Sequence, residues 1–176
     1  MSILRLLRRN TDGSPAASSE TETVRKIVQS LDQLEPERAK FIAAFAYLLS
    51  RAARADLHIS LEETNVMEKI VMERGGLPEN QAVMVIQLAK TQNILFGGTE
   101  NFLVSREFGS VASHEQKMAL LDCLYAVASA DQSISTVEDN EISQIADELR
   151  IEHRDFISVR SRYRDKLAVL KNSPAP

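Results

Sequence analysis

Two short acidic segments recur along the chain at a spacing of 75 residues. Residues 55–63 read ADLHISLEE and residues 130–138 read ADQSISTVE, so that five of nine positions are identical. Both segments follow the pattern A-D-x-x-I-S-x-x-E. Carboxylate oxygens are the donors that hard divalent cations such as calcium and magnesium prefer. The chemistry that this pattern offers is therefore cation binding.

The repeated acids are candidate ligands because like charges repel unless something positive lies between them. If the fold brings the two segments together, a bound cation would relieve that repulsion. The predicted metal ligands are Asp56, Glu63, Asp131 and Glu138. Further acidic side chains crowd the same segments: Glu62, Asp139 and Glu141.

A purely structural interpretation of the same residues stays open. A serine followed three residues later by glutamate is a capping box, in which each side chain satisfies a free backbone N–H group of the other residue. Ser60 with Glu63 and Ser135 with Glu138 fit this rule. The aspartates could cap the preceding turns. Capping explains the residue types, but it leaves the excess of negative charge unexplained.

Other kinds of site are disfavoured by the spacing. An EF-hand loop that began at Asp56 would need glycine at position 6 and glutamate at position 12, where the chain has Leu61 and Met67. Cys123 has no second cysteine, and the three histidines lack paired ligand spacing. No serine or cysteine carries the surroundings of an activated nucleophile. We therefore expect a protein that is not an enzyme.

Composition indicates one domain with an acidic body. The 176 residues are 44% hydrophobic, which is enough for one core, and the net charge of −4 becomes −7 without Arg5, Arg8 and Arg9. An acidic body disfavours nucleic acid and favours cations or basic protein partners. The lone cysteine and the lack of a signal or membrane-spanning pattern predict a cytoplasmic protein.

The helical spacing of apolar residues predicts an all-α fold. We expect about seven helices in a domain of residues 20–171, preceded by a flexible basic tip and linker of residues 1–19 and followed by a disordered tail of residues 172–176. The tip, residues 1–9, could make weak peripheral contact with a membrane or dock on an acidic partner. The expected helices span about 19–34, 36–54, 60–75, 78–97, 113–130, 136–150 and 154–171, with a short helix between residues 98 and 107.

The 75-residue register extends beyond the acidic segments into these helices. Leu49 aligns with Leu124, and Ile70 aligns with Ile145. The repeated unit is therefore helix, acidic turn, helix. Two copies of such a unit predict two pseudo-symmetric helical-hairpin halves, in contrast to a longer array of short repeats.

At these two turns the sequence resembles the TerB family, named for tellurite-resistance operons, and it is similar to the TerB-like domain of membrane-anchored J-domain co-chaperones. The motifs 55–63 and 130–138 carry the resemblance, with the alanine-rich helices before them, over about residues 24–170. Family turns usually read Asp-Gly, where this chain has Asp56-Leu57 and Asp131-Gln132. The resemblance implies two helical halves, an acidic cluster for divalent cations, and a link to tellurite or stress response.

Two functions from different classes follow. The first is a cation-binding stress-response domain that uses both acidic turns. The second is a metal-free module that docks a protein partner, whose identity the sequence does not give, through its helices.

Overall fold

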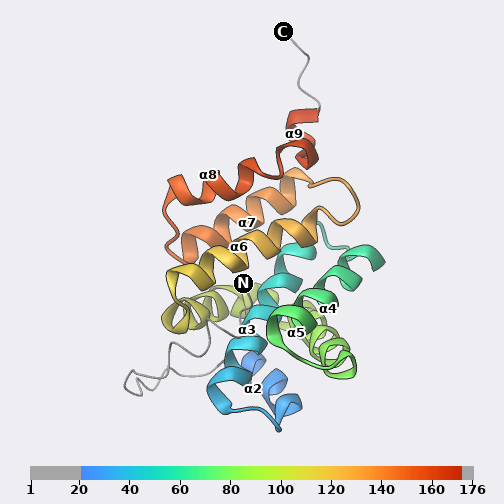
Figure 1. The fold of residues 1–176 in the computed structure, drawn as a ribbon, viewed down its shortest axis with the longest axis vertical. Coiled ribbons are helices and arrows are strands. Elements are labelled where there is room, and N and C mark those ends of the chain that lie inside the picture. The colour runs from blue at the N-terminus through green and yellow to red at the C-terminus, as the bar shows by residue number, and fades with distance from the viewer. Residues whose placement is uncertain (1–20, 172–176) are drawn as a thin grey trace.

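A computed structural model describes residues 21–171 of the chain, and it is helical in that range (Figure 1). Apart from an isolated bridge between Ile134 and Leu167, the described residues contain no β-structure. The described residues form eight α-helices and two 3-10 helices. The 3-10 helices are η1 (Gln29–Leu31) and η2 (Arg164–Lys166). The α-helices are α2 (Glu22–Val28), α3 (Pro36–Ala53), α4 (Leu61–Gly75), α5 (Glu79–Val111), α6 (His114–Ala128), α7 (Thr136–Glu148), α8 (His153–Ser161) and α9 (Ala168–Lys171).

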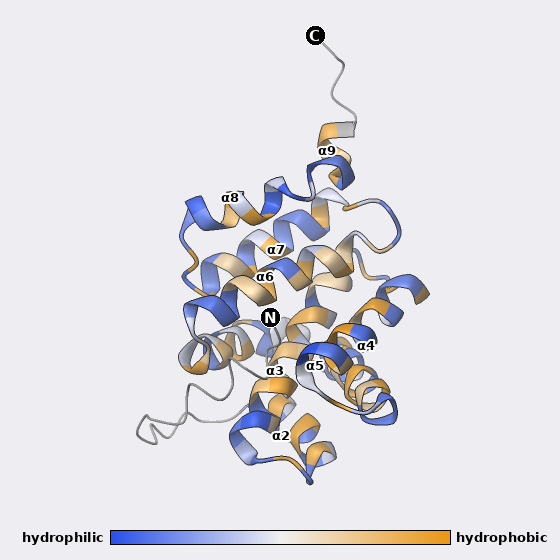
Figure 2. Ribbon diagram, in the orientation of Figure 1, coloured by the Kyte–Doolittle hydropathy of each residue, from blue (hydrophilic) through white to orange (hydrophobic). Residues whose placement is uncertain are grey.

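Helix α3 is the centre of the core, and α2, α4, α5, α6 and α7 pack against it. It is mostly hydrophobic in Figure 2, whereas α8 at the upper edge has long hydrophilic stretches. Glu35 caps its N-terminus through a bond from the Arg38 N–H, and Pro36 takes the first turn, where its missing N–H costs nothing. Phe41 of α3 contacts Phe108 of α5 with ring centroids 5.1 Å apart.

Helix α5 corrects the prediction of a helix end at Gly97-Gly98. The structure continues as one helix of 33 residues through both glycines. The helix bends at these glycines. The Asn93 amide donates to Asn101 Oδ1 over 3.3 Å, although residues eight apart in a straight helix are about 12 Å apart along the axis. Glycine pairs are frequent points of helix bending. The pair thus allows a bend without ending the helix, and the separate short helix expected after it does not exist.

The C-terminal segment corrects a second prediction. One helix was expected from Arg154 to Lys171, but α8 ends at Ser161, and η2 and α9 follow it. At this point the chain pairs with the second acidic turn, because the Ile134 N–H donates to the Lys166 carbonyl at 2.8 Å and the Ala168 N–H donates to the Ile134 carbonyl at 2.9 Å. A continuous helix would use those backbone groups internally.

The N-terminal helix also begins differently from the prediction. Helix α2 starts at Glu22, and the Thr21 side chain accepts from the Val24 N–H as its cap. Ser19, where this helix was expected to begin, lies outside the described residues, as do the rest of the tip and linker and the C-terminal residues 172–176.

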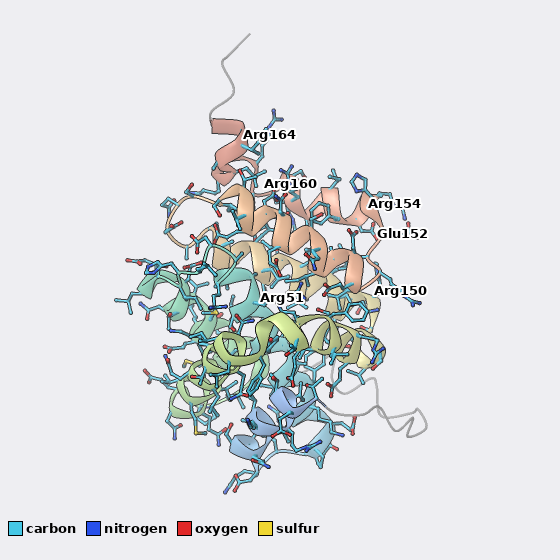
Figure 3. All side chains as sticks on the ribbon, turned by 180° about the vertical axis from the view of Figure 1, so that it is seen from behind. Arg51, Arg150, Glu152, Arg154, Arg160 and Arg164 are labelled. Atoms are coloured by element: carbon cyan, nitrogen blue, oxygen red, sulfur yellow. The ribbon has the colours of Figure 1, made fainter. Side chains whose placement is uncertain are left out.

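A buried arginine joins the central helix to the second half of the chain. Arg51 of α3 donates to Glu141 and Glu148 of α7 and to Ser105 of α5. Figure 3 shows it inside the molecule, while Arg150, Arg154 and Arg164 lie at the periphery. A charged side chain is kept in such a place only where ionic partners and hydrogen bonds surround it.

Candidate acidic site between two turns

The two acidic segments form turns with the same backbone hydrogen bonds. In the first turn, between α3 and α4, the Leu57 N–H donates to the Arg54 carbonyl at 2.8 Å. In the second, between α6 and α7, the Gln132 N–H donates to the Ser129 carbonyl at 3.0 Å. Leu57 has φ of 70° and Gln132 has φ of 75°, the left-handed region that glycine enters most easily. The turns therefore keep the conformation suited to glycine without having one.

Local bonds also occupy one oxygen of each aspartate. Asp56 Oδ1 accepts from the His58 N–H at 3.0 Å, and Asp131 Oδ1 accepts from the Ser133 N–H at the same distance. Both aspartates are exposed. The aspartates therefore cap the turns as predicted. Their Oδ2 atoms take no part in these turn hydrogen bonds.

Both predicted capping boxes are present as well. Glu63 Oε2 accepts from the Ser60 N–H at 2.7 Å, and the Glu63 N–H donates to Ser60 Oγ at 3.1 Å. Glu138 makes the equivalent pair with Ser135, at 2.8 and 3.2 Å. The two glutamates thus begin α4 and α7, with their side chains folded back over the turns.

The fold brings the two turns together. Figure 1 shows the α3–α4 and α6–α7 connections on the same side of the molecule. Burial raises the pKa of Glu63 above its ordinary value, its hydrogen bonds with Ser60 and the nearby Glu138 carboxyl group oppose the rise, and the charge of Asp131 adds to it. The four predicted residues therefore form one electrostatic group, although their carboxylates come from segments 75 residues apart.

Glu138 responds to the same neighbours from the other side. Burial raises its pKa to about 7, against the opposing hydrogen bonds with Ser135, and the charges of Glu63 and Asp56 contribute to the rise. Both glutamates are nearly inaccessible, with 5% of Glu63 and 6% of Glu138 exposed. Two neighbouring carboxyl groups that are shielded from water in this way resist being ionised together.

One oxygen in this group is without a partner. Glu63 Oε1 is buried and makes no hydrogen bond, which is a costly arrangement for a carboxylate. Lys90 of α5 approaches the same helix end, because its ammonium donates to Thr64 Oγ1 at 3.1 Å. No sequence pattern pointed to Lys90, since α5 is distant in the chain and its approach depends on tertiary packing.

The remaining acids of the two segments are placed differently. Asp139 accepts from the Arg160 guanidinium, at 2.6 Å for the shortest bond, and from the Tyr125 hydroxyl. Glu141 is bound to Arg51, and Glu62 is exposed. Only some of the acidic residues of the two segments therefore lie where the turns meet, and Glu62, Asp139 and Glu141 do not. Among residues 21–171, no three His, Cys, Asp or Glu side chains have the arrangement of a preformed metal centre.

Cys123 and His114 are two further side chains of possible chemical interest. Burial raises the pKa of the Cys123 thiol to about 12, which suppresses the reactive thiolate. His114 lies 3.4 Å from Asp155 on the surface. In the described part of the chain, no helix is long and apolar enough to cross a membrane.

Comparison with known proteins agrees with this arrangement of helices and turns. No curated protein and no solved structure matches the chain. The family model described as tellurite resistance protein TerB matches residues 41–161, which run from α3 through both turns to the end of α8. The chain belongs to the TerB family.

Proposed function

We propose that this TerB family domain binds a divalent cation, calcium or magnesium, between its two acidic turns. The observation that carries the proposal is the meeting of Glu63 and Glu138, two glutamates from remote segments that are 5% and 6% exposed and that each affect the pKa of the other. A cation among them would compensate the charge that burial otherwise penalises.

The ligand set that we propose is Asp56, Glu63, Asp131 and Glu138. Glu63 supplies a buried oxygen with no other partner, and the two exposed aspartates each keep one oxygen free of turn hydrogen bonds. All the donors are oxygens, which suits calcium or magnesium better than zinc. The exposed aspartates put the entry to the site at the surface, so an ion can arrive without unfolding the domain.

The role that we propose is non-enzymatic. The junction of the turns holds acids that cap helices, and the single cysteine is buried and protonated. Cation binding would tie α4 and α7 together through their N-termini. We propose that this stabilised form serves a tellurite or general stress response; the family description, tellurite resistance protein TerB, supports the first of these.

Calorimetric titration of the full chain with calcium and with magnesium tests the proposal, with thermal unfolding in parallel. Saturable heat and a rise in Tm that follows ligand linkage would support it. Both should disappear in the double variant Asp56→Asn with Asp131→Asn. Glu62→Gln is the matched control, because this exposed acid lies beside Glu63 and contributes no ligand. Equal stabilisation of the double variant and the control would refute the site.

A metal-free docking module is the second candidate, favoured by exposed apolar residues at the same turns. Leu57 is 78% exposed, Leu61 is 70% exposed and Val137 is 52% exposed, next to the exposed acids. A basic, partly apolar protein segment would suit such a surface. This candidate predicts partner binding that persists in EDTA and weakens in the variant Leu57→Ser with Leu61→Ser.

A further inference from the structure

Helix α5 exposes large apolar side chains on both sides of its bend. We call these residues the α5 patch: Ile94, Leu95, Phe102 and Leu103, with exposed fractions of 59%, 62%, 55% and 37%. Leu95 and Phe102 lie on either side of the bend. Between them Gly98 faces open space, since a Cβ placed there would meet nothing within 4 Å. Large apolar side chains that are exposed this near to one another in the chain are typical of an interaction site.

The described chain begins at the edge of this patch. The Thr21 N–H donates to Glu107 Oε2 at 3.2 Å, and the Thr23 N–H donates to Glu100 Oε2 at 3.1 Å. Glu100 and Glu107 flank Leu103 on α5, three residues before it and four after it. The twenty residues that precede Thr21 therefore start from α5 itself, next to one of the four patch residues.

Those twenty residues include a segment of matching chemistry. Ile3, Leu4, Leu6 and Leu7 follow the spacing that puts apolar residues on one face of a helix, with Arg5, Arg8 and Arg9 between and after them. Residues 10–20 form a connection that reaches roughly 36 Å when extended. That exceeds the width of a helix, about 10 Å, so the segment can reach the outer face of α5.

We propose that residues 3–7 dock on the α5 patch of the same molecule, with their apolar side chains covering Leu95 and Phe102. The attachment at Thr21 favours this occupant, because a short connection keeps the segment at an effective concentration of about millimolar. The near edge of the patch carries charges of both signs, Glu100 and Glu107 together with Arg106, whose guanidinium lies 5.9 Å from the centroid of the Phe102 ring, so the contact that we propose is an apolar one. This contact is separate from the acidic turns, and it does not depend on cation binding.

Paramagnetic NMR on the full chain tests the contact. A nitroxide is attached to the variant Ser2→Cys, and Cys123 does not compete because it is 1% exposed and burial raises its pKa to about 12. We expect strong broadening of the amide signals of residues 94–103 in the labelled molecule. The matched control carries the same label with Leu4→Asp and Leu7→Asp, and its broadening should fall to that of a freely tethered label.

Two further samples separate the possible occupants. In a mixture of labelled protein without isotope and isotopic protein without label, an intramolecular contact gives no broadening of residues 94–103. Broadening in that mixture would overturn the proposal in favour of a second copy. In the singly labelled molecule, broadening that the two aspartate substitutions leave unchanged would overturn it in favour of chance proximity. Absence of broadening would overturn it as well, and would leave the patch open to another protein or a membrane.

Discussion

Two hydrogen bonds, of 2.6 and 3.1 Å, join the guanidinium of Arg51 to the carboxylate of Glu148 across the interface between α3 and α7. Only 2% of the arginine side chain and 9% of the glutamate side chain are exposed. Glu141 accepts from the remaining face of the guanidinium at 2.5 Å. The ion pair thus fastens the helix that leads into the first turn to the helix that leaves the second.

Replacing this arginine should destabilise the domain strongly. Arg51→Met leaves Glu141 and Glu148 without their cation in a dry interface, and breaking a buried pair in this way costs about 3–5 kcal/mol. Urea denaturation at pH 7 measures the loss of unfolding free energy. Arg54→Met, three residues along and more exposed, is the control and should change stability by less than about 1 kcal/mol. Equal losses in both variants would mean that the pair adds nothing specific.

The glutamate pair predicts an unusual dependence of stability on pH in the absence of metal. Burial raises the pKa of Glu138 to about 7 in the folded protein, from an ordinary value of 4.5. The folded state therefore binds more protons between these values, and stability falls as pH rises through this range. Glu138→Gln removes the charge, and glutamine can still cap, as Gln116 does at Ser113.

Above pH 7 the Glu138→Gln variant should consequently be more stable than the parent protein by on the order of 2 kcal/mol, and below pH 4.5 the difference should become small. Urea titrations in EDTA between pH 4 and pH 8 measure it. Glu62→Gln, an exposed neighbour of Glu63, should follow the parent. Parallel stability curves for all three proteins would contradict the burial of Glu138.

Glycine in the two turns should stabilise the protein. Leu57 and Gln132 have positive φ, which costs a residue with a side chain about 1 kcal/mol. Leu57→Gly and Gln132→Gly remove that cost, and the greater freedom of glycine in the unfolded chain offsets part of the gain. We expect a net increase of up to about 1 kcal/mol for each. Gln87→Gly, in the regular part of α5, should instead lose about 1 kcal/mol by thermal unfolding.

Alanine at the bend of α5 should also be tolerated. An added Cβ at Gly98 meets nothing within 4 Å, and alanine has the higher helix propensity. Gly98→Ala should therefore raise the free energy of unfolding by roughly 0.5–1 kcal/mol. Gly76→Ala should lower it, because Gly76 ends α4 with φ of 65°. A loss of stability at Gly98 would show that the bend needs glycine flexibility.

Much of this architecture could be predicted from local sequence signals. The starts of α4, α6 and α7 follow Ser60, Ser113 and Ser135 as the capping-box rule requires, and the all-α class is confirmed. The TerB resemblance is confirmed over residues 41–161. These features depend on neighbouring residues, so the sequence displays them directly. The two-fold relation of the halves remains a prediction, supported by turns of matching structure.

The failed predictions at α5 and at the last helix concern segments that make tertiary contacts. Gly97-Gly98 was expected to end a helix, but α5 continues through both glycines while it packs against α3. The last helix breaks because its backbone pairs with Ile134. At the acidic site, the sequence could give the candidate residues but not the capture of Asp139 by Arg160, which removes that acid from the junction.

The pairing of Ile134 with the segment around Leu167 makes this late segment a support of the second acidic turn. Residues 166–168 hold the second turn through these backbone hydrogen bonds, although Lys166 lies 32 positions after Ile134 in the chain. A stop codon or a protease cut just before residue 166 would thus remove the backbone hydrogen bonds that hold the turn carrying Asp131 and Glu138. Loss of residues 166–168 would then disturb the place where the two acidic turns meet.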